Sequence, residues 1–304
     1  MCVTCGCSDG AQTTYTRFDQ QNEQAANHHS HTHVMADGTV MTHTHSTDGH
    51  THAHSSAPHH HPPTSPTPPS HPSSLAQTHA QAHGTTLSLE QNLLAKNSQI
   101  AEHNRTWLQN QNITALNLVS SPGAGKTTLL VKTIEDLKDE LPIAVIEGDQ
   151  ETANDAERIA ATGAPTIQVN TGTGCHLEAA MVKRGLDTLK PPAHSLVLIE
   201  NVGNLVCPAL FDLGEQAKVV MLSVTEGEDK PTKYPHMFRA SQVMVLTKID
   251  LLPYVNFDVQ RCLDNALGVN PNLAIFQVSA STGAGLNTWY DWLRATFISP
   301  VTGR

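Results

Sequence analysis

Leu116-Asn-Leu-Val119 and the stretch that follows it, Ser120-Ser-Pro-Gly-Ala-Gly-Lys-Thr-Thr128, decide the fold of this chain. The first four residues are mostly apolar and predict a buried strand, and a helical pattern follows the second stretch. Between the strand and the helix, Gly123 and Gly125 let backbone N–H groups wrap phosphates, and Lys126 reaches the terminal phosphates. A strand, a glycine-rich turn and a helix in this order predict a phosphate-binding loop, or P-loop.

The remaining residues of this loop complete a nucleotide site. Thr127 is expected to bind Mg²⁺ through its hydroxyl at the amino end of the helix, and Ala124 and Thr128 are counted among the nucleotide-binding residues. Ser120 stands where the general pattern has its first Gly. Because that Gly serves backbone turning rather than chemistry, we keep the P-loop prediction.

Two acidic residues stand at the ends of later apolar runs, Asp149 in Ile146-Glu-Gly-Asp-Gln150 and Glu200 in Leu198-Ile-Glu-Asn-Val-Gly203. Both are expected to meet Mg²⁺ or the attacking water. The spacing of Glu200 and Gly203 matches the switch II segment of GTPases, in which a Gly N–H senses the γ-phosphate. For Asp149, capping of the next helix is the alternative. The predicted catalytic residues are Lys126, Asp149 and Glu200.

The segment Thr247-Lys-Ile-Asp250 is expected to recognise the base of the nucleotide. It matches the guanine-binding Asn-Lys-x-Asp pattern with Thr in place of Asn. The carboxylate of Asp250 can accept from two guanine N–H groups that adenine lacks, and the stem of Lys248 can cover the base. Ser279-Ala-Ser-Thr-Gly283 supplies a second loop, in which Ser279 and Ala280 offer backbone N–H groups to the base oxygen. GTP is therefore favoured over ATP.

Apolar runs rich in Val and Ile alternate with helical patterns from Ile113 onward. This alternation predicts an α/β fold, a mostly parallel sheet flanked by helices, of the P-loop NTPase type. Ligands of such sheets bind beyond the carboxyl ends of the strands, where the motifs above fall. The predicted strands lie near residues 113–120, 142–147, 165–170, 195–201, 217–224, 242–247 and 273–279.

The first part of the chain has a different composition. Of the 19 His, all but four lie before residue 84, among Ser, Thr, Pro and Gln, so this part cannot bury a core. We expect residues 1–87 to form a disordered metal-binding arm and residues 88–304 a GTPase domain. Ser88 and Gln91 have capping-box spacing and predict the start of an amphipathic helix. The scattered His favour buffering of nickel or zinc over a purification tag.

Cys2, Cys5 and Cys7 form a Cys-x-x-Cys-Gly-Cys cluster in which closely spaced thiolates can hold one metal ion. Ni²⁺ in square-planar geometry suits these ligands, and Zn²⁺ would also be accepted. A thioredoxin-like redox role would require the pair at the end of a strand within a fold, which the polar sequence that follows does not supply.

A second group of ligands is expected inside the domain, where Cys175 and His176 are adjacent and Cys207 follows Glu200 by seven residues. Three ligands do not close a metal site, and the missing ones would come most simply from a two-fold related subunit. We therefore predict a homodimer with a bridging or tuning metal. The alternative is that Cys175 and Cys207 are ordinary buried cysteines, the class to which Cys262 is assigned.

Charge and composition exclude several partners. The net charge of −10 and the lack of basic runs argue against nucleic acid or an anionic membrane, and no apolar run approaches a membrane span. The amino terminus has neither the basic start nor the apolar stretch of a secretory signal, so a cytoplasmic location is expected.

Taken together, these motifs resemble those of the HypB family of hydrogenase nickel incorporation proteins, SIMIBI-class GTPases, over essentially the whole chain. The resemblance implies a homodimer-forming GTPase that works with HypA and a SlyD-type prolyl isomerase to insert nickel into the large subunit of [NiFe]-hydrogenase. It also implies a tight nickel site at Cys2, Cys5 and Cys7, and a zinc or nickel site at Cys175, His176 and Cys207. The adjacent Cys175 and His176 favour HypB over the urease GTPase UreG, which has a Cys-Pro-His motif.

Other functions remain open at this point. The chain could be a nickel and zinc store with a vestigial GTPase, although the complete P-loop argues against that. It could also be a GTPase chaperone for urease or a cobalamin enzyme, because such proteins share the nucleotide motifs. Low intrinsic turnover is expected in each case, since these motifs contain no obvious catalytic Gln or Arg finger.

Overall fold

The structure, a computed structural model, describes residues 13–18, 29–34, 40–45 and 75–298. Cys2, Cys5 and Cys7 and most of the expected arm lie outside these residues. The chain divides into two compact units, one made of Met1–Gln20 with Thr86–Arg304 and the other of Gln21–Thr85.

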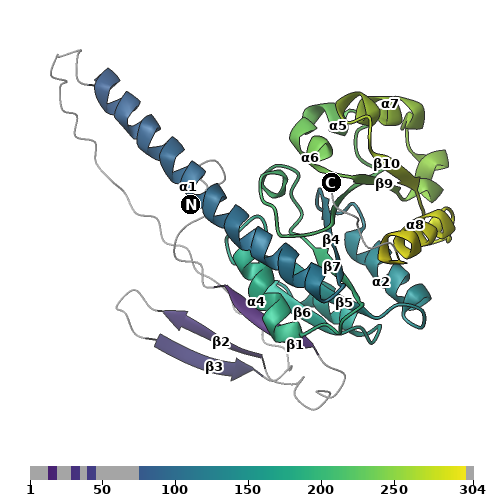
Figure 1. Ribbon diagram of the computed structural model, residues 1–304, viewed down its shortest axis with the longest axis horizontal. Helices are drawn as coiled ribbons and strands as arrows, with labels where there is room; N and C mark the ends of the chain where they lie inside the picture. Colours follow the sequence, from purple (N-terminus) through teal and green to yellow (C-terminus); the bar gives the residue numbers. More distant parts are fainter. Residues whose placement is uncertain (1–12, 19–28, 35–39, 46–74, 299–304) are drawn as a thin grey trace, which may run out of the picture. The chain divides into compact units, whose positions relative to one another are not determined.

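An eight-stranded sheet forms the centre of the first unit, with the strand order β1-β6-β5-β7-β4-β8-β9-β10 (Figure 1). All neighbouring strands pair in parallel except β1 and β6, which are antiparallel. The predicted α/β fold is therefore confirmed. The strands are β1 Thr14–Phe18, β4 Thr114–Ser120, β5 Ile143–Asp149, β6 Thr166–Asn170, β7 Leu196–Glu200, β8 Ala217–Ser223, β9 Val243–Thr247 and β10 Ala274–Gln277.

Helices cover both faces of this sheet (Figure 1). The α-helices are α1 Leu75–Asn110, α2 Lys126–Leu137, α3 Asn154–Ala160, α4 Ala179–Leu189, α5 Lys230–Lys233, α6 Pro235–Ala240, α7 Val259–Val269 and α8 Leu286–Ile298, and the 3₁₀ helices are η1 Cys207–Ala209 and η2 Ile249–Tyr254.

The side chains of β7 show how the two faces are assigned. Leu198 packs into a cluster with residues of α2 and α8, whereas Ile199 packs into a second cluster with residues of α1 and α4. Successive side chains of a strand point to opposite faces, so Glu200 follows Leu198 toward α2. This alternation decides what each residue at the end of the strand can reach.

The structure differs from the sequence-based expectation at β1, which was assigned to the disordered arm. Thr14–Phe18 pairs along its whole length with β6 and thus covers one edge of the sheet. The run Thr-Tyr-Thr-Arg-Phe is rich in β-branched and aromatic residues, which favour extended backbone. Because an open sheet edge offers unpaired N–H and C=O groups, a short segment of this kind can add to it.

The start of α1 also differs from the prediction. The helix begins at Leu75 rather than at Ser88, so the capping-box pair Ser88 and Gln91 lies inside it. Residues 75–87 include several Ala, Gln and Leu, which have good helix propensity. In the second unit, β2 (His29–Val34) and β3 (Val40–His45) form a two-stranded antiparallel sheet, where no secondary structure was expected.

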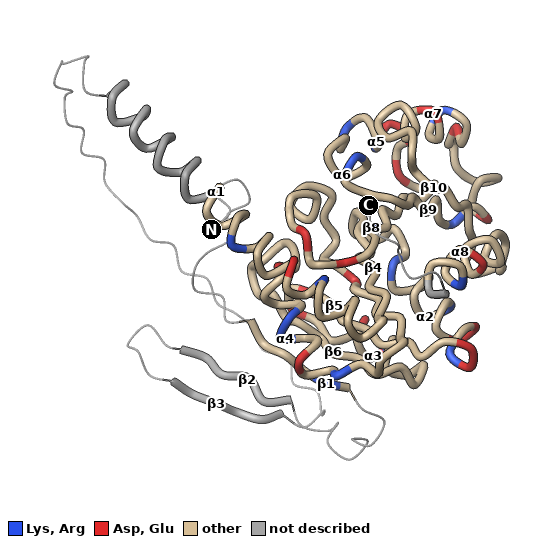
Figure 2. The backbone as a smooth tube through the Cα atoms, in the orientation of Figure 1, with Lys and Arg blue, Asp and Glu red and all other residues tan. Residues whose placement is uncertain are grey.

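Charged residues of both signs are interspersed over the helices and loops of the first unit (Figure 2). Within the described part of the chain, every helix is too short or too polar to cross a membrane. The expectation that nucleic acid is not a partner stays a prediction.

Candidate functional site

The P-loop connects β4 to α2 at the carboxyl edge of the sheet. Gly123 has a φ of 75° and Gly125 a φ of 94°, both in the left-handed region that glycine adopts without strain. A Cβ at Gly123 would meet nothing within 4 Å, so backbone conformation rather than space requires glycine there. The turn directs the chain into α2, whose first residues are Lys126 and Thr127.

Ser120, the residue that departs from the general P-loop pattern, contacts the P-loop lysine. Lys126 Nζ donates to Ser120 Oγ over 2.9 Å, and Ser120 Oγ donates to the carbonyl oxygen of Ser121 over 2.6 Å. Burial lowers the pKa of Lys126, although the nearby Glu200 acts in the opposite direction. Ser120 thus offers the lysine an oxygen partner at the base of the loop, which a glycine could not.

Thr127 and Glu200 lie together below this loop. Thr127 Oγ1 donates to Glu200 Oε1 over 2.8 Å, and Glu200 is 4% exposed. Burial raises the pKa of Glu200 to about 7, against the opposing effects of Lys126 and Thr127. Glu200 Oε2 is buried and has no hydrogen-bond partner among the described residues. Oxygen donors with a spare carboxylate oxygen fit Mg²⁺, so Thr127 and Glu200 suit the predicted magnesium site.

A second buried carboxylate, Glu147, lies next to Glu200 and was not singled out from the sequence. Glu147 on β5 is in register with Glu200 on β7 and is 2% exposed. Burial, followed by repulsion from Glu200 and Asp149, raises the pKa of Glu147 to about 9. Its Oε2 also lacks a partner in the described structure. The signal was available, because Glu147 precedes Asp149 by two residues and so shares its face of the strand.

The carboxylate of Asp149 has a local role. Asp149 Oδ2 accepts hydrogen bonds from the backbone N–H and the hydroxyl of Thr152, each over 2.8 Å. Burial raises the pKa of Asp149, but the Thr152 hydrogen bonds outweigh this effect and leave it below its ordinary value. These contacts close a local turn before α3, whose N-cap is Ala153 and which has no side-chain cap hydrogen bond, so Asp149 does not cap that helix. A metal role for this residue stays a prediction.

The guanine-type motif is attached to the P-loop. Thr247 Oγ1 donates to the carbonyl oxygen of Ala124 over 2.6 Å, and Lys248 Nζ donates to that of Gly123 over 2.7 Å. Thr247, which replaces the usual Asn, therefore links the motif to the P-loop backbone. Asp250 follows at the start of η2.

The second guanine loop follows β10 and reaches the first. The backbone N–H of Ile249 donates to the carbonyl oxygen of Val278 over 3.3 Å, which joins the two loops next to Ser279. Ser279 is fully buried and its N–H donates to Ala284, whereas the following Ala280 is half-buried. The structure thus brings together Lys248, Asp250, Ser279 and Ala280, and their roles toward a base stay predictions.

Gly203, the predicted switch II glycine, lies directly against the P-loop. A Cβ at this position would lie 3.1 Å from three atoms of Pro122. A side chain here would require one of the two segments to shift, so glycine permits their close approach. A movement of the P-loop backbone at Pro122 would therefore displace Gly203.

Cys175, His176 and Cys207 come together at the carboxyl edge of the sheet, on the face opposite to Thr127 and Glu200. Their ligand atoms all lie within 4.8 Å of one another, with 3.2 Å between the two Sγ atoms and 3.6 Å between Cys175 Sγ and His176 Nδ1. Cys207 is a buried, free thiol. Burial lowers the pKa of His176 to about 4, so the imidazole is neutral at physiological pH, as metal ligation requires. The cluster fits a borderline metal such as Zn²⁺ or Ni²⁺.

Two asparagines connect this cluster to the switch II segment. Asn201, which follows Glu200, accepts a hydrogen bond from the backbone N–H of Leu177 over 3.0 Å. Asn204, which follows Gly203, donates to the carbonyl oxygen of Cys175 over 3.3 Å. Neither asparagine was identified from the sequence, because polar residues after a strand also occur as ordinary loop residues.

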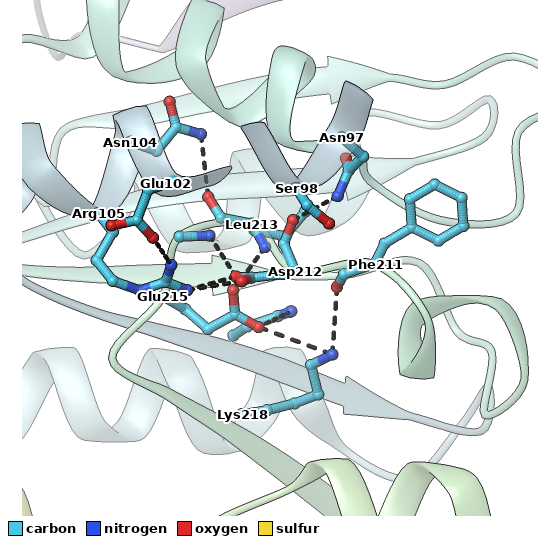
Figure 3. Close-up of polar contacts among 12 residues, drawn as sticks. Asn97, Ser98, Glu102, Asn104, Arg105, Phe211, Asp212, Leu213, Glu215 and Lys218 are labelled. Carbon is cyan, nitrogen blue, oxygen red and sulfur yellow. Dashed lines mark hydrogen bonds and ion pairs between the residues drawn. The ribbon is translucent and has the colours of Figure 1, made fainter. Parts of the chain in front are cut away.

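Polar side chains of helix α1 contact the segment around Asp212 and Leu213, which follows Cys207 in the chain (Figure 3). Asn104 Nδ2 donates to the carbonyl oxygens of Ala179 and Leu213 over 2.9 and 3.0 Å. Arg105 contacts both carboxylate oxygens of Asp212 over 2.8 and 2.7 Å. These bonds hold the chain that follows Cys207 against the start of α4. The sequence signal was a polar Asn in the apolar stripe of the helix.

Comparison with known proteins agrees with this geometry. The family model described as "CobW/HypB/UreG, nucleotide-binding domain" matches residues 114–277. The hydrogenase maturation factor HypB of Escherichia coli K12 is 56% identical over 220 residues, which cover 72% of this chain and 76% of that protein. The factor of the same name from Cupriavidus necator is 43% identical over 342 residues, covering 97% of this chain and 88% of that protein.

Two solved structures are also similar to this chain. The crystal structure of hydrogenase maturation factor HypB from Archaeoglobus fulgidus has 39% identity and a TM-score of 0.63, covering 67% of this chain and 99% of that one. HypB from Helicobacter pylori in complex with nickel has 35% identity and a TM-score of 0.63, covering 66% and 95% of the two chains.

The fold and the site together define a P-loop nucleotide-binding protein with a cluster of soft metal ligands beside its switch II segment. The family model covers more than half of the chain, and the similarity to the Escherichia coli protein covers over two thirds of both sequences. The chain therefore belongs to the CobW/HypB/UreG family, and within it to the HypB hydrogenase maturation factors.

Proposed function

We propose that this protein is a GTP-hydrolysing nickel metallochaperone, in which the GTP cycle controls delivery of nickel to the large subunit of [NiFe]-hydrogenase. Nickel is the cargo of this process. The names of the relatives and the nickel complex of one of them support the proposal. HypA and a SlyD-type prolyl isomerase are the proposed accessory partners.

The nucleotide half of the proposal assigns GTP to the carboxyl edge of the sheet. Gly123, Gly125 and Thr128 would contribute backbone N–H groups to the phosphates, and Lys126 would contact the terminal ones. Mg²⁺, when bound, neutralises charge on the phosphates, and Thr127 and Glu200 are its proposed ligands.

The observation that carries the proposal is the pair of hydrogen bonds between the switch II segment and the metal cluster. Asn201 and Asn204 flank Gly203 and contact the backbone of residues 177 and 175, on either side of His176. Gly203 in turn lies against Pro122 of the P-loop. A displacement of Gly203 by a γ-phosphate would therefore move Cys175 and His176 relative to Cys207 and change the affinity of the cluster for metal.

A second subunit is part of the proposal, because three ligands leave a tetrahedral or square-planar site incomplete. Val206 and Leu210, on either side of η1, are large apolar side chains with 57% and 58% exposure. Apolar residues that surround a ligand such as Cys207 suit a two-fold contact that brings two clusters together. We infer a homodimer that depends on nucleotide and metal.

The test is the nickel affinity of the domain cluster in the full-length Cys2/Cys5/Cys7→Ala variant, with GDP and with a non-hydrolysable GTP analogue. The thiolate-to-nickel absorption band reports only cysteine ligation, so imidazoles elsewhere do not contribute. We expect affinities that differ at least about fivefold between the two nucleotides, as is typical of allosteric coupling. Equal affinities would overturn the proposal and favour a metal store.

Asn201→Ala in the same background sharpens this test. It leaves the three metal ligands in place but removes the contact to Leu177, so we expect nickel binding to persist and its nucleotide dependence to shrink. Asn265→Ala is the control, because the side chain of Asn265 is also hydrogen-bonded to the backbone, where it donates to the carbonyl oxygen of Glu228 away from the cluster. If both variants keep the full dependence, coupling does not pass through Asn201.

A further inference from the structure

Thr247 ends β9 at a point where β8, β9 and the P-loop meet. It is opposite Ser223, the last residue of β8, in the parallel pairing of the two strands, and it is 4% exposed. Its hydroxyl lies between two backbone carbonyl oxygens, that of Ala124 in the P-loop at 2.6 Å and that of Leu222 on β8 at 3.3 Å. The hydroxyl therefore has a carbonyl acceptor on the P-loop side and another on the β8 side.

The hydroxyl of Thr247 has one proton to donate, and otherwise offers only lone pairs. Because a carbonyl oxygen can only accept, the proton goes to one of the two carbonyls, and the shorter distance assigns it to Ala124. Turning the proton away from both would leave two buried oxygen atoms 2.6 Å apart with no hydrogen bond between them. Thr247 thus has no proton left for a nucleotide base.

Lys248, the next residue, also directs its polar group to the P-loop. Its φ of 58° lies in the left-handed region, and its Nζ donates to the carbonyl oxygen of Gly123 over 2.7 Å. A Cβ at Gly125 would lie 3.7 Å from Lys248 Cε, an ordinary van der Waals contact, so the lysine stem runs along the P-loop. Both Thr247 and Lys248 therefore use side-chain donors to attach the segment Thr247-Lys-Ile-Asp250 to the P-loop backbone.

Guanine presents two kinds of hydrogen-bonding atoms to such a segment. Its N7 and O6 atoms accept, whereas its ring N–H and exocyclic amine donate. The carboxylate of Asp250 only accepts, so it suits the donors, and N7 requires a donor from elsewhere. The Asn of the general pattern has two amide N–H groups, so one can hold the P-loop while the other donates to the base. The single proton of Thr247 can serve only the P-loop.

We propose that Thr247 sets the base specificity of this site, so that guanine is recognised without a side-chain hydrogen bond to its N7 atom. The inference deepens the proposed function and rests on it, since it assumes that the segment binds a guanine nucleotide. The site then accepts guanine nucleotides whose position 7 offers no hydrogen-bond acceptor. One such ligand is 7-deaza-GDP, in which a C–H group replaces N7.

The first test compares GDP with 7-deaza-GDP in the full-length wild-type protein with Mg²⁺. Displacement of a ribose-labelled fluorescent GDP gives both dissociation constants, and diphosphates avoid hydrolysis during the titration. A net hydrogen bond corresponds to about two- to tenfold in affinity. Because this bond is missing at N7, we expect the two dissociation constants to agree within about twofold. A larger loss of affinity for 7-deaza-GDP would overturn the proposal.

Thr247→Asn supplies the missing donor. Its second amide N–H should strengthen the binding of GDP but not of 7-deaza-GDP, so we expect the preference for GDP to rise at least about threefold over wild type. Circular dichroism and thermal unfolding would show that the variant is folded. An unchanged preference in the folded variant would contradict the assignment of specificity to Thr247.

Thr247→Val and Thr247→Ser separate the P-loop link from base recognition. Val has nearly the shape of Thr but lacks the hydroxyl, so it should weaken both nucleotides by the same factor, about two- to tenfold, through loss of the bond to Ala124. Ser keeps the hydroxyl and should retain the affinity for both. If Val weakens GDP and leaves 7-deaza-GDP unchanged, the hydroxyl contacts N7 and the proposal is wrong.

The outcomes for this inference and for the proposed function can be told apart. If nickel affinity is the same with GDP and the GTP analogue while 7-deaza-GDP binds like GDP, the proposed function fails and the specificity assignment stands. If nickel affinity depends on nucleotide while 7-deaza-GDP binds much more weakly than GDP, only the specificity assignment fails.

Discussion

The two faces of the sheet at the end of β7 hold different chemistry, although the residues involved are neighbours in sequence. On the α2 face, Thr127 and Glu200 present oxygen atoms below the P-loop. On the α4 face, Asn201 holds the backbone next to His176, where thiol and imidazole ligands gather. Hard oxygen ligands suit Mg²⁺ and softer sulfur and nitrogen ligands suit nickel or zinc, so we expect each face to favour a different metal.

This difference arises from the two-residue period of a strand. Consecutive residues, Glu200 and Asn201, serve opposite faces, so a single displacement of the strand end reaches both sites. The two sites can therefore be coupled without sharing a ligand. Variants that disable one face and leave the other intact are the direct way to examine this arrangement.

The largest effect is expected for Lys126→Ala on the nucleotide face. Removing the buried cation that is proposed to contact the terminal phosphates should lower GTP turnover by about 10³-fold, the scale of one lost transition-state contact. Nickel binding at the Cys175 cluster should persist, which spectrophotometric titration would check. Lys132→Ala on the same helix is the control, because Lys132 pairs with Asp136 at the surface. Loss of nickel binding in Lys126→Ala would contradict the separation of the faces.

The second largest effect is expected in the pH dependence of the free energy of unfolding, to which the buried carboxyl of Glu147 contributes. The pKa of Glu147 is raised to about 9 in the folded protein. Between its ordinary pKa and this value, the native state keeps a proton that the unfolded chain has released. Its contribution to stability is therefore complete at low pH and is lost as pH rises toward 9, by roughly 1.4 kcal/mol per pH unit.

Glu147→Gln, which imitates the protonated form, should remove this loss. The stability difference between the variant and wild type should grow by about 3 kcal/mol between pH 5 and pH 7 in urea unfolding without nucleotide or Mg²⁺. The pKa of His176 is lowered, so the contribution of His176 to stability is complete at pH values above its ordinary pKa and is lost only as the pH falls below it. A difference that does not change with pH would show that Glu147 is ionised in the native state.

On the metal face, Cys175→Ser should weaken nickel binding in the Cys2/Cys5/Cys7→Ala background at least a hundredfold, because loss of a ligand exceeds the roughly 10–100-fold effect of losing an outer-shell partner. GTP turnover should remain. Cys262→Ser is the control, since this cysteine is buried in the cluster beneath α7, away from the other thiols. Retention of the full absorption band in Cys175→Ser would exclude Cys175 as a ligand.

The smallest effect is expected for Asn104→Ala, which acts on the support of the metal face. The substitution leaves two buried carbonyls without the Nδ2 donor, at a cost of about 1–3 kcal/mol in the free energy of unfolding. Asn110→Ala, at the exposed end of α1, should change stability by less than about 1 kcal/mol. Similar results for both variants in urea unfolding would show that Asn104 does not support this face.

The main strands and the P-loop could be predicted because their signals are local. Mostly apolar runs such as that before Ser120 indicate burial on both faces, and a glycine-rich turn between a strand and a helix is typical of a phosphate-binding loop. The prediction failed for β1 because a five-residue strand carries too little periodicity to be recognised without the edge that receives it. It failed at the start of α1 because Ser88 can lie within a helix as well as cap one.

The candidate site was predictable to a different degree on its two faces. Lys126 and Asp250 lie in spaced motifs, and Cys175 and His176 stand out as adjacent ligands. Asn201 and Asn104, by contrast, are polar residues of ordinary type, whose importance depends on which backbone groups they meet. Glu147 could have been found from its spacing to Asp149, but the sequence does not show that it lies beside Glu200 of β7.

The sequence by itself determined the α/β class, the order of the nucleotide motifs and the types of ligand atom available to a metal. These follow from composition, spacing and periodicity, which are properties of neighbouring residues. Only the tertiary structure decided that Cys207 meets Cys175, that switch II contacts the metal cluster through Asn201, and that β1 begins beside Asn170. Such contacts join segments far apart in the chain, and the packing of the whole sheet, rather than any local preference, brings them together.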